Sequence, residues 1–421
     1  MKPRKLHIIY YVLKFRLSRT CHPNKVGWLT QLKWKRNLRK SPFYNAIVSK
    51  GLRFPVIDKK IFMAKFDRIN TKGIKKDEAF EIALKAEESR DFASTMNGVS
   101  VGLSSGTSGN RGMFLTSRKE QEKWVGAILE RVIGLSFKKR RVAFFLRANN
   151  NLYEAVKSKL IQFDFYDLQQ NLNNLIVDFI KSNSNIIVAQ PSVLLEIARH
   201  CDKHTISIKF DKVISVAEVL EEDIKTYVES VFKSPISQVY QCTEGFLAYT
   251  CKLGSMHLNE DFLKIDRHYL DTEHTKFHPI ITDYLRYTQP VIMYELNDIL
   301  HIGEQCRCGS QAAAISKIEG RSDDVFRFTK EGEEYIIFPD FIRRAIILSQ
   351  DTITNYIVSQ KSNDEVTLSI EGNHKSLLEE GSIALRKLLD KKKLPHVTVS
   401  VTDFEHNPIL KFKRIRNDYS K

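Results

Sequence analysis

Short apolar runs alternate with amphipathic helical patterns from about residue 90 onward, and this alternation restricts the fold more than any other feature. The apolar runs have the length of buried strands and lie at 142–147, 185–190, 212–219 and 237–244. Residues 172–182 and 220–232, which lie between such runs, have apolar residues at helical spacing. We therefore expect an α/β fold built mainly of parallel strands layered with helices.

The pattern changes after Gly320. It predicts strands at 324–328, 334–338, 354–360, 365–371 and 397–401, a turn at 330–332, and helices from 340 and near 375–391. This unit of about 100 residues is large enough to fold as a separate small α+β domain. The sequence thus predicts three parts, which are a helical segment at 1–57, a large domain at 58–320 and a small domain at 321–421.

The positive charge of the chain is concentrated at its N-terminus. Residues 1–57 contain 14 Lys and Arg and no Asp or Glu, although the whole chain has 66 basic and 50 acidic residues. Leu6, Ile9, Leu13 and Leu17 recur there at helical spacing. Such a basic amphipathic helix usually packs on its own core, but it can also lie on an anionic membrane surface or contact a partner. No zinc-finger, helix-turn-helix or RNP-type signature accompanies the charge, so nucleic acid is not expected as a partner.

The hydropathy of the same segment bears on location. The apolar run at 6–13 is interrupted by His7 and is less than half of the roughly 20 residues that span a bilayer. Basic residues follow it in place of a small-residue cleavage site, so we expect a cytoplasmic protein, with or without peripheral contact to a membrane. The six cysteines are too sparse for a disulfide scaffold and indicate free thiols or metal ligands.

A loop rich in glycine and hydroxyl residues follows at 103–116. Its three glycines and the four Ser or Thr residues at 104–108 allow backbone N–H groups and hydroxyls to surround phosphate oxygens. The loop lacks the Lys-Ser or Lys-Thr pair of an ordinary P-loop, which disfavours that class of NTPase. Alone, such a segment is most often a surface turn, so its interpretation depends on the motifs that follow.

Those motifs occur in a fixed order. They are Ser104, Ser105, Gly106, Thr107, Ser108 and Gly109, then 216–218 (Val-Ala-Glu), 240–245 (Tyr-Gln-Cys-Thr-Glu-Gly), 294–298 (Tyr-Glu-Leu-Asn-Asp) and 320–324 (Gly-Arg-Ser-Asp-Asp). In this order they resemble the adenylate-forming, acyl-activating superfamily over residues 55–421, and within it the phenylacetate–coenzyme A ligase-like branch. The chain also resembles proteins related to the synthetase of a deazaflavin coenzyme and capsule-cluster homologues.

The resemblance implies a large adenylation domain, a small mobile lid domain and a role for each motif. The 104–109 loop would face pyrophosphate, Glu218 would lie on the adenine side, and Tyr240, followed by Gln241, would flank adenine. Thr243 would donate to the α-phosphate and Glu244 would bind Mg²⁺. A carboxylate that attacks ATP meets charge repulsion, so a cation and fixed dipoles on the phosphates are needed.

The remaining implied contacts have plainer alternatives. Asp298 would accept from both ribose hydroxyls and Arg321 would complete the nucleotide site, but a buried structural ion pair between such residues is the alternative. Cys242 is interpreted as a small packed thiol. A lysine of the small domain would stabilise the adenylation transition state. Lys411 is the candidate and Lys413 the second choice, because Leu410 replaces the usual preceding glycine.

Two further positions depart from the family's pattern. Met293 stands where relatives often have Arg, and Arg111 stands near the place of a missing phosphate-loop lysine. The expected function is ATP-dependent formation of an acyl-AMP from a small carboxylic acid, followed by transfer to a thiol of coenzyme A or a carrier protein. The alternatives are an adenylyltransferase that leaves AMP on its substrate and a nucleotide-binding scaffold.

A separate group of thiols predicts a zinc site. Cys251 and His257 have the spacing Cys-x5-His, and Cys306 and Cys308 form Cys-x-Cys-Gly further along the chain. Three thiolates and one imidazole make a closed tetrahedral set for structural Zn²⁺. The alternatives are reduced thiols with a surface histidine, or a disulfide between Cys306 and Cys308, which is disfavoured by its spacing and by a reducing compartment.

Overall fold

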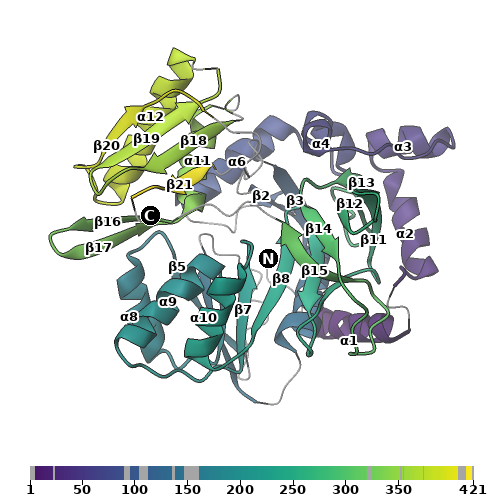
Figure 1. The fold of residues 1–421 in the computed structure, drawn as a ribbon. Helices are drawn as coiled ribbons and strands as arrows, with labels where there is room; N and C mark the ends of the chain where they lie inside the picture. The colour runs from purple at the N-terminus through teal and green to yellow at the C-terminus, as the bar shows by residue number, and fades with distance from the viewer. Residues whose placement is uncertain are drawn as a thin grey trace. The chain divides into compact units, whose positions relative to one another are not determined.

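The computed structural model describes residues 5–21, 24–89, 95–103, 112–134, 138–146, 161–319, 325–350, 353, 355–372, 374–405 and 414–419 (Figure 1). Their contacts divide the chain into two compact units. The first contains Met1–Leu103 and Met113–Gly320, and the second centres on Arg321–Lys421.

The first unit is built on a 12-stranded sheet, one half of which is parallel. The parallel strands lie in the order β5 (Ile161–Asp167), β4 (Arg140–Leu146), β6 (Ile186–Ala189), β7 (Lys212–Val216) and β8 (Ile236–Cys242). The four strands expected from apolar runs are confirmed, with ends shifted by at most three residues. β5 was not expected, because charged residues interrupt its apolar pattern.

The other half of the sheet is antiparallel, so the expectation of mainly parallel strands holds for only part of it. It continues through β9 (Gly245–Thr250), β10 (Met256–Leu258), β15 (Ala314–Glu319), β14 (Ile299–Ile302), β12 (Lys276–Asp283) and β11 (Leu263–Tyr269), with β13 (Val291–Glu295) beside β12. Only Thr243 and Glu244 separate β8 from β9, and so short a connection permits only an antiparallel pair.

Helices cover both faces of the parallel strands. Alternate residues of a strand point to opposite faces, and apolar residues occur on both, so both faces need a covering layer. On one face Phe145 stacks on Tyr166 at 4.6 Å between ring centroids and meets Phe179 of α8 (Leu172–Lys181) at 5.3 Å. Helices α9 (Pro191–Lys203) and α10 (Glu222–Phe232) contact each other and continue this layer beside β7 (Figure 1). On the other face Phe144 joins a core with residues of α7 (Arg118–Ile128) and the π-helical turn η1 (Leu129–Ile133).

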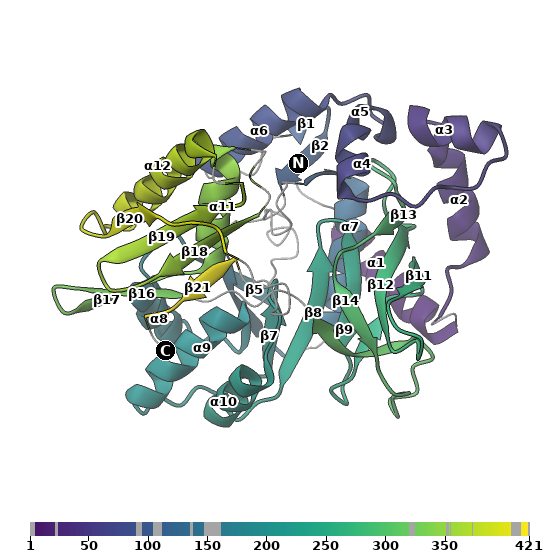
Figure 2. The same ribbon diagram turned by 45° about the horizontal axis from the view of Figure 1, so that its top comes forward.

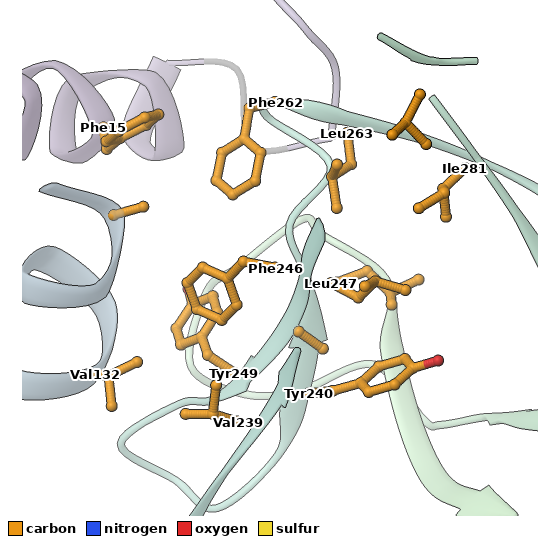
Figure 3. Packing of buried hydrophobic residues seen from close by; sticks show 14 of the residues in the cluster. Phe15, Val132, Val239, Tyr240, Phe246, Leu247, Tyr249, Phe262, Leu263 and Ile281 are labelled. Atoms are coloured by element: carbon orange, nitrogen blue, oxygen red, sulfur yellow. The ribbon is translucent and has the colours of Figure 1, made fainter. Parts of the chain in front are cut away.

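The N-terminal helices belong to the same core. Ile8, Val12 and Phe15 of α1 (Lys5–Cys21) are buried, and Phe15 meets Phe262 edge to face at 5.4 Å (Figure 3). Leu6, Ile9, Leu13 and Leu17, which suggested the helix, are exposed instead. The periodicity therefore identified the helix but not its buried face. The helix packs closely on α7, since a Cβ at Gly126 would lie 2.6 Å from the Cβ of Tyr11.

The remaining elements of the first unit are short. They are α2 (Trp28–Leu38), α3 (Pro42–Ser49), α4 (Lys59–Ala64), α5 (Phe66–Ile69), α6 (Lys76–Ser89), and a three-stranded sheet of β1 (Thr95–Met96), β2 (Val99–Leu103) and β3 (Met113–Ser117). Trp34 of α2 donates its indole N–H to the Arg286 carbonyl at 3.2 Å, which ties this helix to the loop before β13. Figure 2 shows α2 and α3 near the edge of the sheet formed by β11 and β13.

The second unit is a small α+β domain of the predicted order. A hairpin of β16 (Phe326–Lys330) and β17 (Glu333–Ile337) precedes a four-stranded sheet of β20 (Thr398–Val401), β19 (Glu365–Ile370), β18 (Tyr356–Gln360) and β21 (Ile415–Asn417). Its helices are α11 (Pro339–Ser349) and α12 (Lys375–Lys391). β21 was not expected, and it pairs in parallel with β18. None of the described helices is both long and apolar enough to cross a bilayer.

Candidate active site

The turn between β8 and β9 presents two of the predicted site residues. Thr243 and Glu244 occupy the turn and are half-buried, whereas Gln241 is exposed. The register of the two strands shifts between Tyr240 and Gln241, and such a bulge redirects the side chains that follow it. A Cβ at Gly245, at the end of the turn, would lie 3.2 Å from a carboxylate oxygen of Asp283, which is a tight contact for a larger residue.

Glu244 is held by a tyrosine of another motif. The Tyr294 hydroxyl donates to Oε1 of Glu244 at 2.9 Å. Tyr294 is 2% exposed and packs edge to face on Phe62 at 5.2 Å. Burial, followed by the charge of Glu244, raises the pKa of the Tyr294 hydroxyl, which therefore keeps its proton and stays a donor. The pair fixes the direction of the Glu244 carboxylate.

Asp298 is held in the same way by Tyr240. The buried Tyr240 hydroxyl donates to Oδ2 of Asp298 at 2.6 Å. Burial, followed by the charge of Asp298, raises the pKa of this hydroxyl well above its usual value. The His278 ring nitrogen Nδ1 lies 3.0 Å from the Asp298 carbonyl oxygen, at the start of β14. The tyrosine of each motif thus binds the carboxylate of the other, and sequence reasoning missed both pairs.

Glu218 lies at the carboxyl end of the neighbouring parallel strand. β7 ends at Val216, and Ala217 has φ +68°, a left-handed conformation that is strained for alanine. Glu218 Oε2 accepts from the Ser192 hydroxyl at 2.7 Å. Ser192 belongs to the first turn of α9, which directly follows β6. Glu218 and the 243–244 turn therefore share the edge where open α/β sheets bind ligands.

Cys242 and Met293 have structural surroundings. The Cys242 thiol donates to the Gly245 carbonyl oxygen at 3.7 Å, and burial raises its pKa well above the usual value, so it behaves as the packed thiol expected from the sequence. Met293 is half-buried against the hydrophobic core and has φ +49°. Its N–H donates to the Thr282 hydroxyl at 3.1 Å.

The remaining predicted residues belong to the phosphate loop, the hinge motif and the small domain. Ser104, Ser105, Gly106, Thr107, Ser108, Gly109, Arg111, Arg321, Lys411 and Lys413 lie outside the described residues. Of the predicted nucleotide site, the described residues are Glu218, Tyr240, Gln241, Thr243, Glu244 and Asp298, all in the first unit.

Asp283, which limits the space at Gly245, titrates abnormally. Complete burial raises its pKa to about 6, although Arg286 and the Leu285 N–H act in the opposite direction. Because the folded protein binds this proton more tightly than the unfolded chain, the free energy of unfolding falls as pH rises toward and past the folded pKa.

We expect the fall in the free energy of unfolding with rising pH to be lost in Asp283→Asn. In the wild type the group should lower the unfolding free energy by about 1 kcal/mol between about pH 5 and pH 7. Urea unfolding at the two pH values measures the difference. Asp178→Asn, at an exposed position of α8, is the control and should keep the wild-type slope. Equal slopes for Asp283→Asn and the wild type would contradict the assignment.

The predicted zinc ligands come together in the first unit. One ligand atom from each of Cys251, His257, Cys306 and Cys308 lies within 4.8 Å of the others. The Sγ atoms of Cys251 and Cys306 are 3.7 Å apart, and Cys308 Sγ is 3.3 Å from His257 Nε2. All six cysteines are free thiols, so the alternative of a disulfide between Cys306 and Cys308 is wrong for this structure.

The surroundings of the cluster fit a structural metal. His257 is fully buried and its Nδ1 lies 3.0 Å from the Ala312 carbonyl oxygen, which directs Nε2 toward the sulfurs. The Leu253 N–H donates to Cys251 Sγ and the Cys308 N–H to Cys306 Sγ, each at 3.4 Å. Three sulfurs and one imidazole nitrogen are a donor set that could hold zinc in tetrahedral coordination. The alternative of a histidine on the surface is wrong.

Comparison with known proteins gives a fold but no family. No protein-family model and no curated protein matches the sequence. The structure is similar to an open form of a 2-hydroxyisobutyryl-CoA ligase solved with 2-HIB-AMP and CoA. The two are 13% identical and have a TM-score of 0.53 over 92% of this chain and 89% of that chain.

The same ligase in its thioesterification state, again with 2-HIB-AMP and CoA, gives a TM-score of 0.51 at 14% identity. That alignment covers 92% of this chain and 90% of the ligase. Identities this low establish the architecture alone. The chain has the fold of the adenylate-forming ligases, with a large mixed sheet and a smaller C-terminal α+β unit.

Proposed function

We propose that this protein uses ATP to convert a small carboxylic acid into an acyl-AMP and then transfers the acyl group to a thiol, of coenzyme A or of a carrier protein. The observation that supports this most is the pair of crossed bonds that orient Glu244 and Asp298. These are the two carboxylates that an adenylation site needs, one toward a metal bound to phosphate and one toward ribose.

The reaction has two balanced steps. A carboxylate oxygen of the acid attacks the α-phosphorus of ATP, and the bond from that phosphorus to the bridging oxygen breaks, which releases pyrophosphate. A thiolate then attacks the acyl carbon, and the bond from that carbon to the AMP oxygen breaks, which releases AMP. The first step brings negative groups together, so it depends on fixed donors and cations around the phosphates.

In this proposal each described residue of the site has one role in binding ATP. Glu244 would hold Mg²⁺, which screens phosphate charge when bound, and Tyr294 would keep the Glu244 carboxylate in position. Thr243 would donate to the α-phosphate, and Asp298 would accept from the ribose hydroxyls. Tyr240 and Glu218 would border adenine at the carboxyl edge of β7 and β8.

Residues outside the described part complete the proposal. The 104–109 loop would bind the leaving pyrophosphate and Arg321 would contact the nucleotide. We assign nucleotide binding to residues 58–320 and the role of a lid to residues 321–421. The ligase of similar fold was solved with 2-HIB-AMP and CoA in two of its states, which supports an acyl-AMP intermediate and coenzyme A as the thiol.

ATP–pyrophosphate exchange tests the proposal directly. Wild-type protein with Mg²⁺ is offered a panel of aryl, hydroxy and fatty acids, and exchange that depends on one acid is expected. Trapping of that acyl group by coenzyme A then identifies the acceptor. Transfer of the AMP label to a stable product would instead support an adenylyltransferase. Tight ATP binding without exchange on any acid would support a scaffold and contradict the proposal.

Lys411 is the proposed cation of the first transition state. We expect Lys411→Ala to slow adenylation by at least about 100-fold, the usual effect of losing one preorganised donor. Consumption of a pre-formed acyl-AMP should change little, because the charge on the pyrophosphate is already gone. Single-turnover assays of the two half-reactions measure this difference. Lys413→Ala is the matched control, and if it alone has the effect, the assignment to Lys411 is wrong.

A further inference from the structure

Helix α1 has two apolar faces, and packing explains only one of them. Ile8, Val12 and Phe15 are no more than 3% exposed. A second apolar group is exposed to solvent, comprising Leu6 (79%), Ile9 (55%), Tyr10 (59%), Leu13 (57%) and Leu17 (65%). At 3.6 residues per turn these five side chains fall within about 100° of the helix circumference, roughly opposite the buried residues. We call these five residues the outer stripe.

The outer stripe is held in a fixed orientation on the first unit. His7 Nδ1 lies 3.0 Å from Glu122 Oε2, and the Arg19 guanidinium donates to Glu130 Oε1 at 2.8 Å. Gly126 of α7 allows the backbone of α1 to approach closely at Tyr11. The helix is therefore fixed along its length by contacts of its inner face with α7 and η1. Its outer stripe is a preformed surface and does not need a folding step to appear.

Basic side chains border the outer stripe. On the same helical projection, Arg16 lies at one edge and Lys14 beyond the other, and both are exposed. Desolvation of its ammonium group, followed by the positive charge of Lys33 on α2, lowers the pKa of Lys14, so positive charges of two helices act on each other here. No Asp or Glu occurs in residues 1–57 to neutralise them locally.

A second exposed apolar group lies at the start of α2. Trp28 (71%), Leu29 (54%) and Leu32 (40%) are exposed, while Trp34 and Leu38 of the same helix are buried in the core. Exposed large apolar residues are common singly, but here they recur on consecutive helices of one basic segment. Their combination with positive charge distinguishes this surface from an ordinary solvent-facing helix.

We propose that the outer stripe of α1, with the basic residues around it, binds the surface of an anionic phospholipid membrane, with the helix lying parallel to that surface. The leucines would enter the boundary between headgroups and acyl chains, and the Lys and Arg side chains would extend to the lipid phosphates. The charge favours a membrane over a second copy of this chain as the partner. A border of Lys and Arg, in a segment without Asp or Glu, attracts an anionic lipid layer and repels a second copy of the same surface. The proposal does not depend on the proposed enzymatic function.

Vesicle flotation tests the proposal with the full-length protein. Phosphatidylcholine vesicles are compared with vesicles that also contain phosphatidylglycerol, at low and high salt. We expect binding only to the anionic vesicles, and weaker binding at high salt. Leu13→Glu combined with Leu17→Glu should weaken binding at least about tenfold, because two leucines of the outer stripe would then carry charges of the wrong sign.

The controls separate this surface from general changes. Ile383→Glu introduces one glutamate charge at an exposed position of α12 (46%) and should bind like the wild type. Circular dichroism and the melting temperature check that each variant is folded. Equal binding to neutral and anionic vesicles would overturn the proposal, as would wild-type binding by the double variant. Absence of vesicle binding together with self-association that the double variant abolishes would assign the outer stripe to a protein interface instead.

Discussion

Glu244→Gln should lose ATP–pyrophosphate exchange by at least about 1,000-fold while the protein stays folded, since the neutral amide removes the charge that a hard divalent cation requires. Gln keeps the size of the side chain and can still accept the hydrogen bond from Tyr294. The loss should therefore appear in activity and not in the melting temperature. Exchange measured over a range of Mg²⁺ concentrations is the assay.

Two controls sharpen this experiment. Glu273→Gln, at an exposed position in the turn between β11 and β12, removes the same charge elsewhere and should keep full exchange. Tyr294→Phe removes only the hydroxyl that orients Glu244, so we expect a smaller loss and a higher requirement for Mg²⁺. Near-normal exchange in folded Glu244→Gln would contradict the metal assignment.

Cys306→Ser should lose bound zinc and lower the melting temperature by at least about 5 °C, because a structural zinc site stabilises the folded state by several kcal/mol. The cluster joins the start of the loop after β9 to the loop between β14 and β15. In Cys306→Ser the two remaining thiols and the buried imidazole would stay close together without a cation to bind them. The wild type should carry about one zinc per chain.

The measurement is elemental analysis of protein purified without chelator or metal-affinity resin, together with thermal unfolding. Cys21→Ser is the matched control, because Cys21 is an exposed thiol outside the cluster. It should keep both the zinc content and the melting temperature. A chelator should lower the melting temperature of the wild type and leave Cys306→Ser unchanged. Zinc far below one equivalent in the wild type would contradict the assignment of a zinc site to this cluster.

The parallel half of the sheet could be predicted because its strands are buried on both faces. β6, with all four residues buried, appears in the sequence as an uninterrupted apolar run. The antiparallel half gives a weaker signal, since β11 alternates apolar and charged residues and β10 has only three residues. Helix α1 was expected from its exposed leucines, and periodicity cannot tell which of two apolar faces meets the core.

The candidate site was predictable in its carboxylates and not in their partners. The order of the motifs singled out Glu244 and Asp298 as candidates, and the spacing of Cys251, His257, Cys306 and Cys308 predicted the cluster that the structure brings together. Tyr240 was expected to flank adenine, and the bond that its hydroxyl donates to Asp298 was not anticipated. That bond joins residues far apart in sequence, and it depends on how β8 and β14 lie within the sheet.

The two crossed bonds also limit how such a site can change over time or be redesigned. Tyr240 and Glu244 come from one stretch of sequence, and Tyr294 and Asp298 from another, yet each bond joins one stretch to the other. A chimera could take only the first stretch from a distant relative. The donor and acceptor at the positions of Tyr240 and Glu244 would then meet Asp298 and Tyr294, whose positions suit the original pair. The two stretches should therefore be exchangeable only as a pair, and a substitution in one should be repaired most readily by a substitution in the other.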